Sequence, residues 1–160
     1  ISVDIGKSGA FCIMSGDSIR TLSMPKIGNE VDYHGICEIL RPYQDNPCHV
    51  VFERLLSLFQ VSKGSTWSLG HQAGAIEMAC VALRLPFTKV PAKTWQAEIF
   101  QGVPPMTRAD GKRDTKGMAL VACKRLFPEL NLLRTPKCTK PDEGTVDSIL
   151  MAEYCRRNFK

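Results

Sequence analysis

The segment at residues 3–10, with the sequence VDIGKSGA, constrains the fold of this chain more than any other. Asp4 lies in a β-branched run, and Gly6 and Gly9, with small residues beside them, turn the chain directly into a second apolar run. A carboxylate at a strand exit beside a tight glycine turn can point into a cleft where a metal ion or a phosphate approaches the backbone. Aspartate and glycine are also ordinary turn formers, so a structural role stays open at this point.

Hydrophobic patterning predicts strands at residues 1–5, 10–14 and 18–24, which form an antiparallel meander. A helix expected at residues 32–40 leads to an apolar strand at 49–52 that ends in Glu53, a pattern typical of a buried parallel strand. The remaining pattern predicts a helix at 67–83, a strand at 86–90, a short helix opened by Pro91, a loop at 101–114, and helices at 115–127 and 144–157.

Three antiparallel strands followed by parallel strands in αβ units predict an α/β fold, a ribonuclease-H-like mixed sheet with helices on both faces. The length of 160 residues and the hydrophobic content of 44% suit a single domain over residues 1–160 with a sizeable core. We expect Trp67 and Trp95 to lie in this core.

Charge and cysteine content limit the possible partners and compartments. The net charge of +5 favours a polyanionic partner but does not require one. The seven cysteines are odd in number and form no C-x-x-C pair, so they indicate buried thiols in a reducing compartment, and the cytoplasm is the expected location. All apolar runs fall well short of about 18 residues, and no signal peptide is visible, so no membrane association is expected.

Carboxylates recur in settings that match Asp4. Glu53 ends a strand expected to lie parallel to the first, which places both side chains at one sheet edge within metal-bridging distance. Glu143 and Asp147 are four residues apart at the start of the last helix and share a face if that turn is helical. Hard oxygen ligands without histidine or cysteine suit Mg²⁺ or Mn²⁺, and two such ions could promote phosphodiester hydrolysis.

Each acid also has an ordinary structural explanation. Asp142 could be the N-cap of the last helix and Asp147 an acid near its first turn, and both would interact favourably with the helix dipole. Glu53 could pair with the neighbouring Arg54. The simultaneous arrangement of the acids, more than any one of them, favours a metal site.

Five segments occur in an order found in a known family. They are residues 3–10 (VDIGKSGA), 51–53 (VFE), 69–74 (LGHQAG), 90–95 (VPAKTW) and 144–154 (GTVDSILMAEY). Together they resemble the RuvC-like Holliday junction resolvases, and the phage-encoded branch is the most similar. The resemblance implies a ribonuclease-H-like homodimer that nicks four-way or branched DNA with divalent metal ions held by four acidic residues, in the host cytoplasm if the chain is phage-encoded.

Carried over by this resemblance, Asp4, Glu53 and Asp147 match the first, second and last acids of the family. Bacterial members have the remaining ligand three residues before the last acid, where this chain has Gly144. Phage-type members have an acid one residue further back, so Glu143 is the predicted fourth ligand, with Asp142 in reserve. The expected cofactor is Mg²⁺ or Mn²⁺, with two ions per site.

The resemblance also implies DNA contacts. Phe59 occupies the position of an aromatic residue that stacks at the junction, and Lys93 and Lys116 match basic positions that contact DNA or assist at the scissile phosphate. Basic residues cluster at 112–116 and 134–140, on either side of the acids, although such runs are commonly solvated surface. The DNA-binding candidates are Phe59, Lys63, Lys93, Lys112, Arg113 and Lys116, with Lys116 also a catalytic candidate.

The predicted function is resolution of four-way junctions and related branched DNA by paired, metal-dependent phosphodiester hydrolysis that leaves 5′-phosphate ends. A non-catalytic module that binds branched DNA through the same fold is the main alternative. Relatives that act on flaps, replication forks or RNA–DNA hybrids are a narrower one. Actin-like ATPases and sugar kinases share the D-x-G loop, but they need two lobes and a second phosphate loop, and this chain is too short for both.

Overall fold

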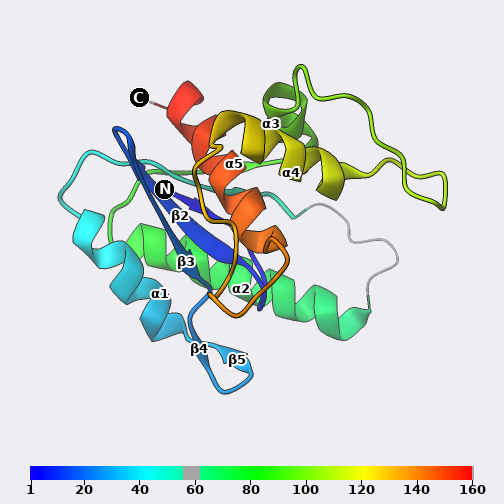
Figure 1. Ribbon diagram of the computed structural model, residues 1–160. Helices are drawn as coiled ribbons and strands as arrows, with labels where there is room; N and C mark the ends of the chain where they lie inside the picture. The colour runs from blue at the N-terminus through cyan, green and yellow to red at the C-terminus, as the bar shows by residue number, and fades with distance from the viewer. Residues whose placement is uncertain (56–61, 160) are drawn as a thin grey trace.

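A five-stranded mixed sheet forms the centre of the protein. The computed structural model describes residues 1–55 and 62–159 (Figure 1). The strand order is β3-β2-β1-β6-β7, with β1–β2 and β2–β3 antiparallel and β1–β6 and β6–β7 parallel. The strands are β1 (Ser2–Val3), β2 (Ala10–Ser15), β3 (Ser18–Ser23), β6 (Val50–Glu53) and β7 (Phe87–Val90). The predicted mixed sheet, antiparallel first and then parallel, is therefore confirmed.

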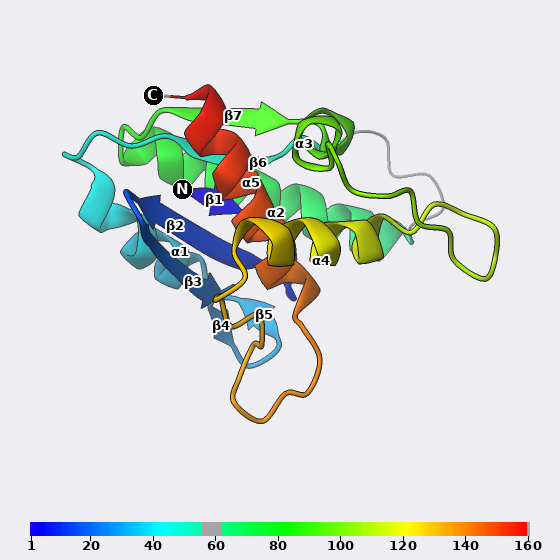
Figure 2. The ribbon, with the colours of Figure 1, turned by 45° about the horizontal axis from the view of Figure 1, so that its top comes forward.

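Helices cover both faces of the sheet, as predicted (Figures 1 and 2). One face carries α3 (Ala92–Ile99), α4 (Thr115–Leu126) and α5 (Glu143–Asn158), and the other carries α1 (Tyr33–Leu40) and α2 (Lys63–Ala82), with a short 3₁₀ turn at Arg41–Tyr43 after α1. Side chains alternate along β6, so Val51 packs under α5 while Val50 and Phe52 pack under α2. This alternation separates the interior into two hydrophobic layers.

Helix α5 is the most deeply buried helix of the described chain, and it lies across β1 and β2. Most of its residues from Gly144 to Cys155 are buried. Ser2 of β1 donates a side-chain hydrogen bond to the carbonyl of Ser148, which joins the helix to the first strand. The start of α5 is consequently held close to the end of β1.

Two element boundaries differ by at least two residues from the sequence-based expectation. The first strand is shorter than residues 1–5 because the chain turns directly after the Asp4 amide donates to the carbonyl of Ala10 at 2.9 Å, and the turn is closed by the Gly9 amide, which donates to the carbonyl of Gly6. Helix α2 begins at Lys63, four residues early, because the Ser62 hydroxyl caps it by accepting from the amide of Ser65.

A small hairpin forms between β3 and α1. It consists of β4 (Lys26–Ile27) and β5 (Glu30–Val31), which pair antiparallel. Lys7 of the glycine turn forms an ion pair with Glu30 at 2.8 Å, so the hairpin lies beside that turn.

The expectation that both tryptophans lie in the core is half wrong. Trp95 is 1% exposed and belongs to the layer under α5, whereas Trp67 on α2 is 75% exposed. Trp67 is the first residue of an exposed, weakly polar stripe on α2, because helical spacing brings the residues at 67, 70, 71, 74, 78 and 81 to one side. Among the described helices, none is long and apolar enough to cross a membrane.

Candidate active site at the carboxyl ends of β1 and β6

Asp4 and Glu53 come together through the parallel pairing of β1 and β6. Val3 is aligned with Phe52, so the next residue of each chain segment lies at the same edge of the sheet. Beyond Asp4 the chain turns at once, with the amide of Gly9 donating to the carbonyl of Gly6 at 2.9 Å. Gly6 has φ of +140°, a conformation that other residues rarely adopt, so the glycine is required by this turn.

Gly144 explains how the first turn of α5 approaches Asp4. A Cβ atom at Gly144 would lie 2.4 Å from the carbonyl oxygen of Ser8 and 3.0 Å from Oδ2 of Asp4. The turn after β1 therefore fills the space that a side chain at position 144 would need. No acid can occupy this position without moving the turn, and Asp147 enters the cluster one helical turn later.

The carboxylates of Asp4, Glu53 and Asp147 are partly buried and lie within electrostatic range of one another. Burial, followed by the negative charges of Asp147, Glu53 and Asp142, raises the pKa of Asp4 to about 8, while Arg134 acts to lower it. Burial, followed by Glu53 and Glu143, raises the pKa of Asp147 to about 7. The pKa of Glu53 is also raised, chiefly by burial. The ionised forms of these three acids are therefore disfavoured on balance.

Glu53 has one well-defined partner. The indole Nε1 of Trp95 donates to Oε1 of Glu53 at 3.0 Å. This bond favours the ionised carboxylate and lowers the pKa of Glu53, although less than burial raises it. Because the indole is neutral, it orients the carboxylate without cancelling its charge.

Asp142, the reserve candidate for the fourth ligand, is engaged on both oxygens. Its Oδ1 caps α5 by accepting from the amide and hydroxyl of Thr145, each at 2.9 Å. Its Oδ2 lies 2.9 Å from Nε of Arg134, although that N–H is not aimed well enough to count as a hydrogen bond. Arg134 also donates from Nη2 to the carbonyl of Ser8. These contacts tie the cap of α5 to the glycine turn.

Glu143, the predicted fourth ligand, is more accessible than Asp142. Its side chain is 63% exposed and forms an ion pair with Lys116 of α4. Both residues line a hollow of about 260 Å³ together with Lys140 and Asp147. Glu143 therefore borders the same hollow as Asp147. Its carboxylate can turn into this hollow once its surface ion pair with Lys116 breaks, and such pairs contribute little free energy.

The donor set fits a hard divalent cation, although its geometry is open. In residues 1–55 and 62–159, no group of three or more His, Cys, Asp or Glu side chains is spaced to hold one ion. Within the same ranges, no basic side chain forms an ion pair with Asp4, Glu53 or Asp147. Carboxylate oxygens are the ligands that Mg²⁺ and Mn²⁺ prefer, and these three are not occupied by a direct ion pair.

The predicted DNA-binding lysines and arginine lie on the surface. Lys63 is exposed in the first turn of α2, Lys93 in the first turn of α3, and Lys116 in the first turn of α4. Lys112 and Arg113 are exposed in the loop between α3 and α4, which extends away from the sheet (Figure 2). Phe59 lies outside the described residues.

Two residues near the acids were not identified from the sequence as part of the site. Trp95 was assigned to the core, and Arg134 was assigned to a basic rim for DNA. Val90 is aligned with Glu53, and Trp95 follows Val90 by five residues. Because a helix that follows a parallel strand packs back over the neighbouring strand, this spacing could have placed the Trp95 indole near Glu53. Arg134 had no such signal, since its partners are eight and 126 residues away.

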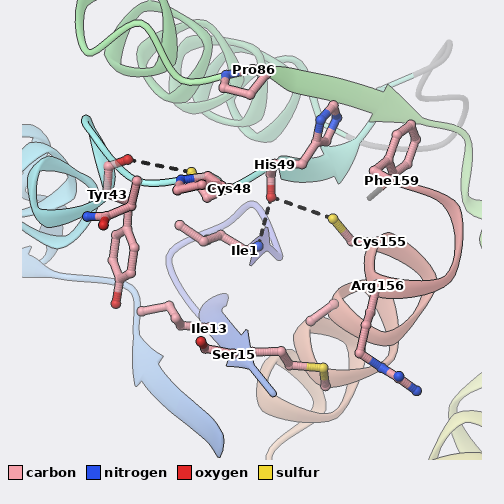
Figure 3. A pocket seen from close by; sticks show the side chains of 14 residues that line it. Ile1, Ile13, Ser15, Tyr43, Cys48, His49, Pro86, Cys155, Arg156 and Phe159 are labelled. Carbon is pink, nitrogen blue, oxygen red and sulfur yellow. Dashed lines mark hydrogen bonds between the residues drawn. The ribbon is translucent and has the colours of Figure 1, made fainter. Parts of the chain in front are cut away.

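A large cavity lies at the opposite end of the sheet. It has a volume of about 1030 Å³ and is lined by residues from the amino ends of the parallel strands and the last turns of α5. Figure 3 shows the carbonyl of His49 there, accepting from the amino group of Ile1 at 2.8 Å and from the Cys155 thiol at 3.5 Å. None of the candidate site residues that the structure describes lines this cavity, so it is separate from the acids.

Comparisons with known proteins identify the fold. No protein-family model and no curated protein sequence matches the chain. The solved structure of Thermus thermophilus RuvC is similar, with a TM-score of 0.54 and 12% identity over 97% of this chain and 93% of that chain. T. thermophilus RuvC in complex with Holliday junction substrate is similar too, with a TM-score of 0.53 and 14% identity over 98% and 94%. The chain has a RuvC-like fold of the ribonuclease-H-like type.

Charge repulsion among the buried acids predicts an unusual response to mutation in the metal-free protein. The carboxyl of Asp4 has a pKa of 3.8 when unperturbed and about 8 in the folded protein, so between these values folding becomes less favourable as pH rises. In EDTA, we expect Asp4→Asn to stabilise the protein by at least about 1 kcal/mol, or about 2–4 °C in melting temperature. The gain should be larger at about pH 8 than at about pH 5.

Asp142→Asn is the matched control, because it removes a charge that has a partner. We expect this variant to lose about 1–2 kcal/mol, since Arg134 is left without its carboxylate. Thermal unfolding in EDTA shows whether Asp4→Asn raises the stability of the protein and Asp142→Asn lowers it. Destabilisation by Asp4→Asn at both pH values would show that Asp4 is a structural turn residue and would contradict the account.

Proposed function

We propose that this protein is a Mg²⁺- or Mn²⁺-dependent endonuclease that nicks four-way junctions and related branched DNA. The observation that supports this proposal is the convergence of Asp4, Glu53 and Asp147, three partly buried acids with raised pKa values, at one edge of a RuvC-like fold. One of the similar solved structures is RuvC in complex with Holliday junction substrate. Branched DNA is therefore the substrate class to test first.

Asp4, Glu53, Asp147 and Glu143 are the proposed metal ligands, for two ions per site. Mg²⁺ or Mn²⁺ would supply the charge that stabilises a phosphodiester transition state and would lower the pKa of water. Asp4 and Asp147 carry the raised pKa values that an adjacent dication would reverse. Glu143 is preferred over Asp142 because both oxygens of Asp142 already have partners.

Lys116 is the proposed catalytic cation. In the described structure it pairs with Glu143, and both side chains are largely exposed. If Glu143 turns towards a metal ion, the ammonium group of Lys116 is released beside the hollow that it shares with Asp147. A phosphate of the cleaved strand is the partner that this ammonium group would then bind. The products would carry 5′-phosphate and 3′-hydroxyl ends.

The proposed DNA surface consists of exposed cations around the acids, contributed by three different helices and one loop. They are Lys63, Lys93, Lys112, Arg113 and Lys116, all of them exposed, and Lys116 borders the hollow that Asp147 and Glu143 line. Cations of this kind bind phosphates in a salt-dependent way and carry no sequence information. The shape of the branch, more than its sequence, should therefore determine the site of cleavage.

A homodimer is part of the proposal, and the exposed stripe on α2 is its proposed interface. Met78 and Val81 are 62% and 55% exposed, and Trp67 is 75% exposed. Gly70 and Gly74 leave open space on the same side. In an antiparallel pair centred between residues 72 and 73, Trp67 faces the Met78 of the partner and His71 faces the Gly74 of the partner, so large residues meet small or flexible ones. Two copies would then make the paired nicks.

Cleavage of a labelled four-way junction, compared with a linear duplex of the same arm sequences, tests the nuclease. We expect symmetric nicks in Mg²⁺ on the junction alone. Loss of an outer-shell partner of a metal ligand typically lowers activity about 10–100-fold. Asp4→Asn changes a proposed ligand itself, so it should lower the cleavage rate by more than this, while junction binding persists. Asp17→Asn, an exposed acid in the turn between β2 and β3, is the control and should keep full activity.

Other outcomes of this assay would contradict the proposal in different ways. Binding of the junction without nicks by either protein, unchanged by EDTA, would identify a non-catalytic binding module. Equal cleavage of the linear duplex would remove the junction selectivity but leave the metal-dependent chemistry.

A charged substitution in the α2 stripe tests the dimer. Met78→Arg should convert the dimer to a monomer, because it would bury an unpaired charge at the interface. Val121→Arg, at an apolar position 40% exposed on α4, is the control and should leave the mass unchanged. Light scattering coupled to size-exclusion chromatography measures both. A monomeric wild-type protein, or a dimer that tolerates Met78→Arg, would contradict this interface.

A further inference from the structure

The indole of Trp95 forms the one side-chain hydrogen bond that Glu53 accepts within the described structure. Nε1 of Trp95 lies 3.0 Å from Oε1 of Glu53. Trp95 is 1% exposed and belongs to the largest fully buried side chains of the protein. A buried indole N–H has a single hydrogen to donate and no lone pair, so this contact has one direction only.

Backbone register and packing hold the indole in place. Val90 of β7 is aligned with Glu53 of β6, and the amide of Arg54 donates to the carbonyl of Val90 at 2.9 Å. Helix α3 begins two residues later, which brings Trp95 back over the end of β6. The indole packs edge-to-face against Phe100, with ring centroids 6.0 Å apart. The ring therefore has little freedom to turn away from the carboxylate.

The contact differs from the other contacts to acids in this region. Arg134 and Lys116 pair with Asp142 and Glu143, and each pair cancels the negative charge of its acid. Trp95 is neutral, so it fixes Oε1 of Glu53 and leaves the full negative charge of the carboxylate and the second oxygen, Oε2, available. A ligand that must be held at one angle and must still attract a cation needs a donor of this kind.

We propose that Trp95 is a positioning residue for Glu53, which fixes Oε1 and leaves Oε2 as the oxygen that would bind a divalent cation. This inference rests on the proposed function, because it assumes that Glu53 is a metal ligand. A purely structural indole, whose N–H simply uses the nearest acceptor, would be equally buried. Metal affinity and a spectroscopic signal distinguish the two roles.

Fluorescence offers a direct readout because the chain contains only two tryptophans. Trp67→Phe leaves Trp95 as the sole tryptophan, in contact with a proposed ligand. In this background, titration with Mg²⁺ should change the emission of Trp95, and the change should saturate at the concentration where calorimetry shows metal binding. Adding Glu53→Gln should abolish the change. This measurement needs neither DNA nor catalysis.

Substitution of Trp95 supplies the second readout. Trp95→Phe keeps an aromatic ring and removes the N–H, and it should weaken Mg²⁺ binding by about tenfold. In a protein that already carries Glu53→Gln, Trp95→Phe should have no further effect on Mg²⁺ affinity, because Trp95 acts through Glu53. Phe100→Leu is the packing control, since it loosens the same aromatic contact but keeps the N–H donor, and its affinity should stay within about twofold of wild type.

Each outcome supports or overturns the inference. If Mg²⁺ binds and Trp95 emission does not respond, or Phe100→Leu weakens binding as much as Trp95→Phe, the indole is structural and the inference is wrong, while the proposed nuclease stands. If no Mg²⁺ binds to the wild-type protein, both the inference and the metal-dependent function are wrong. Should Trp95→Phe fail to fold, the emission titration decides alone.

Discussion

Mutual repulsion of partly buried carboxylates is the constraint around which this structure is arranged. Asp4, Glu53 and Asp147 come from three different segments, and burial raises the pKa of each, with like charges adding to the rise for Asp4 and Asp147. Burial of α5 across β1 and β2 holds them together against this repulsion. The peripheral acids Asp142 and Glu143 form ion pairs, whereas the central three form none in the described structure. A fold that keeps such a cluster has a place for a cation.

Much of the site could be predicted because it depends on parallel strand pairing. The β-branched run before Asp4 and the apolar run before Glu53 identify two strands, and parallel pairing brings their carboxyl ends together whatever the rest of the chain does. Helical spacing similarly brings Asp147 one turn after Gly144. Both relations follow from patterns within single strands and helices, so they could be predicted from the sequence. The RuvC-like similarity at 12–14% identity agrees with the predicted fold.

Details that depend on tertiary contacts could not be predicted. Composition gives Trp67 and Trp95 the same preference for burial, yet α2 leaves one exposed while α3 turns the other towards Glu53. Arg134 was grouped with neighbouring cations as a DNA rim, but its contacts are with Asp142 and the carbonyl of Ser8. Contacts between residues this far apart in the sequence produce no periodic pattern from which they could be predicted. The absence of a side chain at Gly144 likewise has a steric reason, because the turn after β1 fills the space that a side chain would need.

Anomalous diffraction from crystals equilibrated with Mn²⁺ would test the central claim most directly, since it locates the ion itself. The account predicts anomalous peaks between Asp4 and Asp147, with Glu53 in contact through Oε2 and Glu143 turned away from Lys116. Asp142 should keep its contacts with Thr145 and Arg134. Absence of a peak at these acids at saturating Mn²⁺, or a peak held by Asp142 in place of Glu143, would contradict the account.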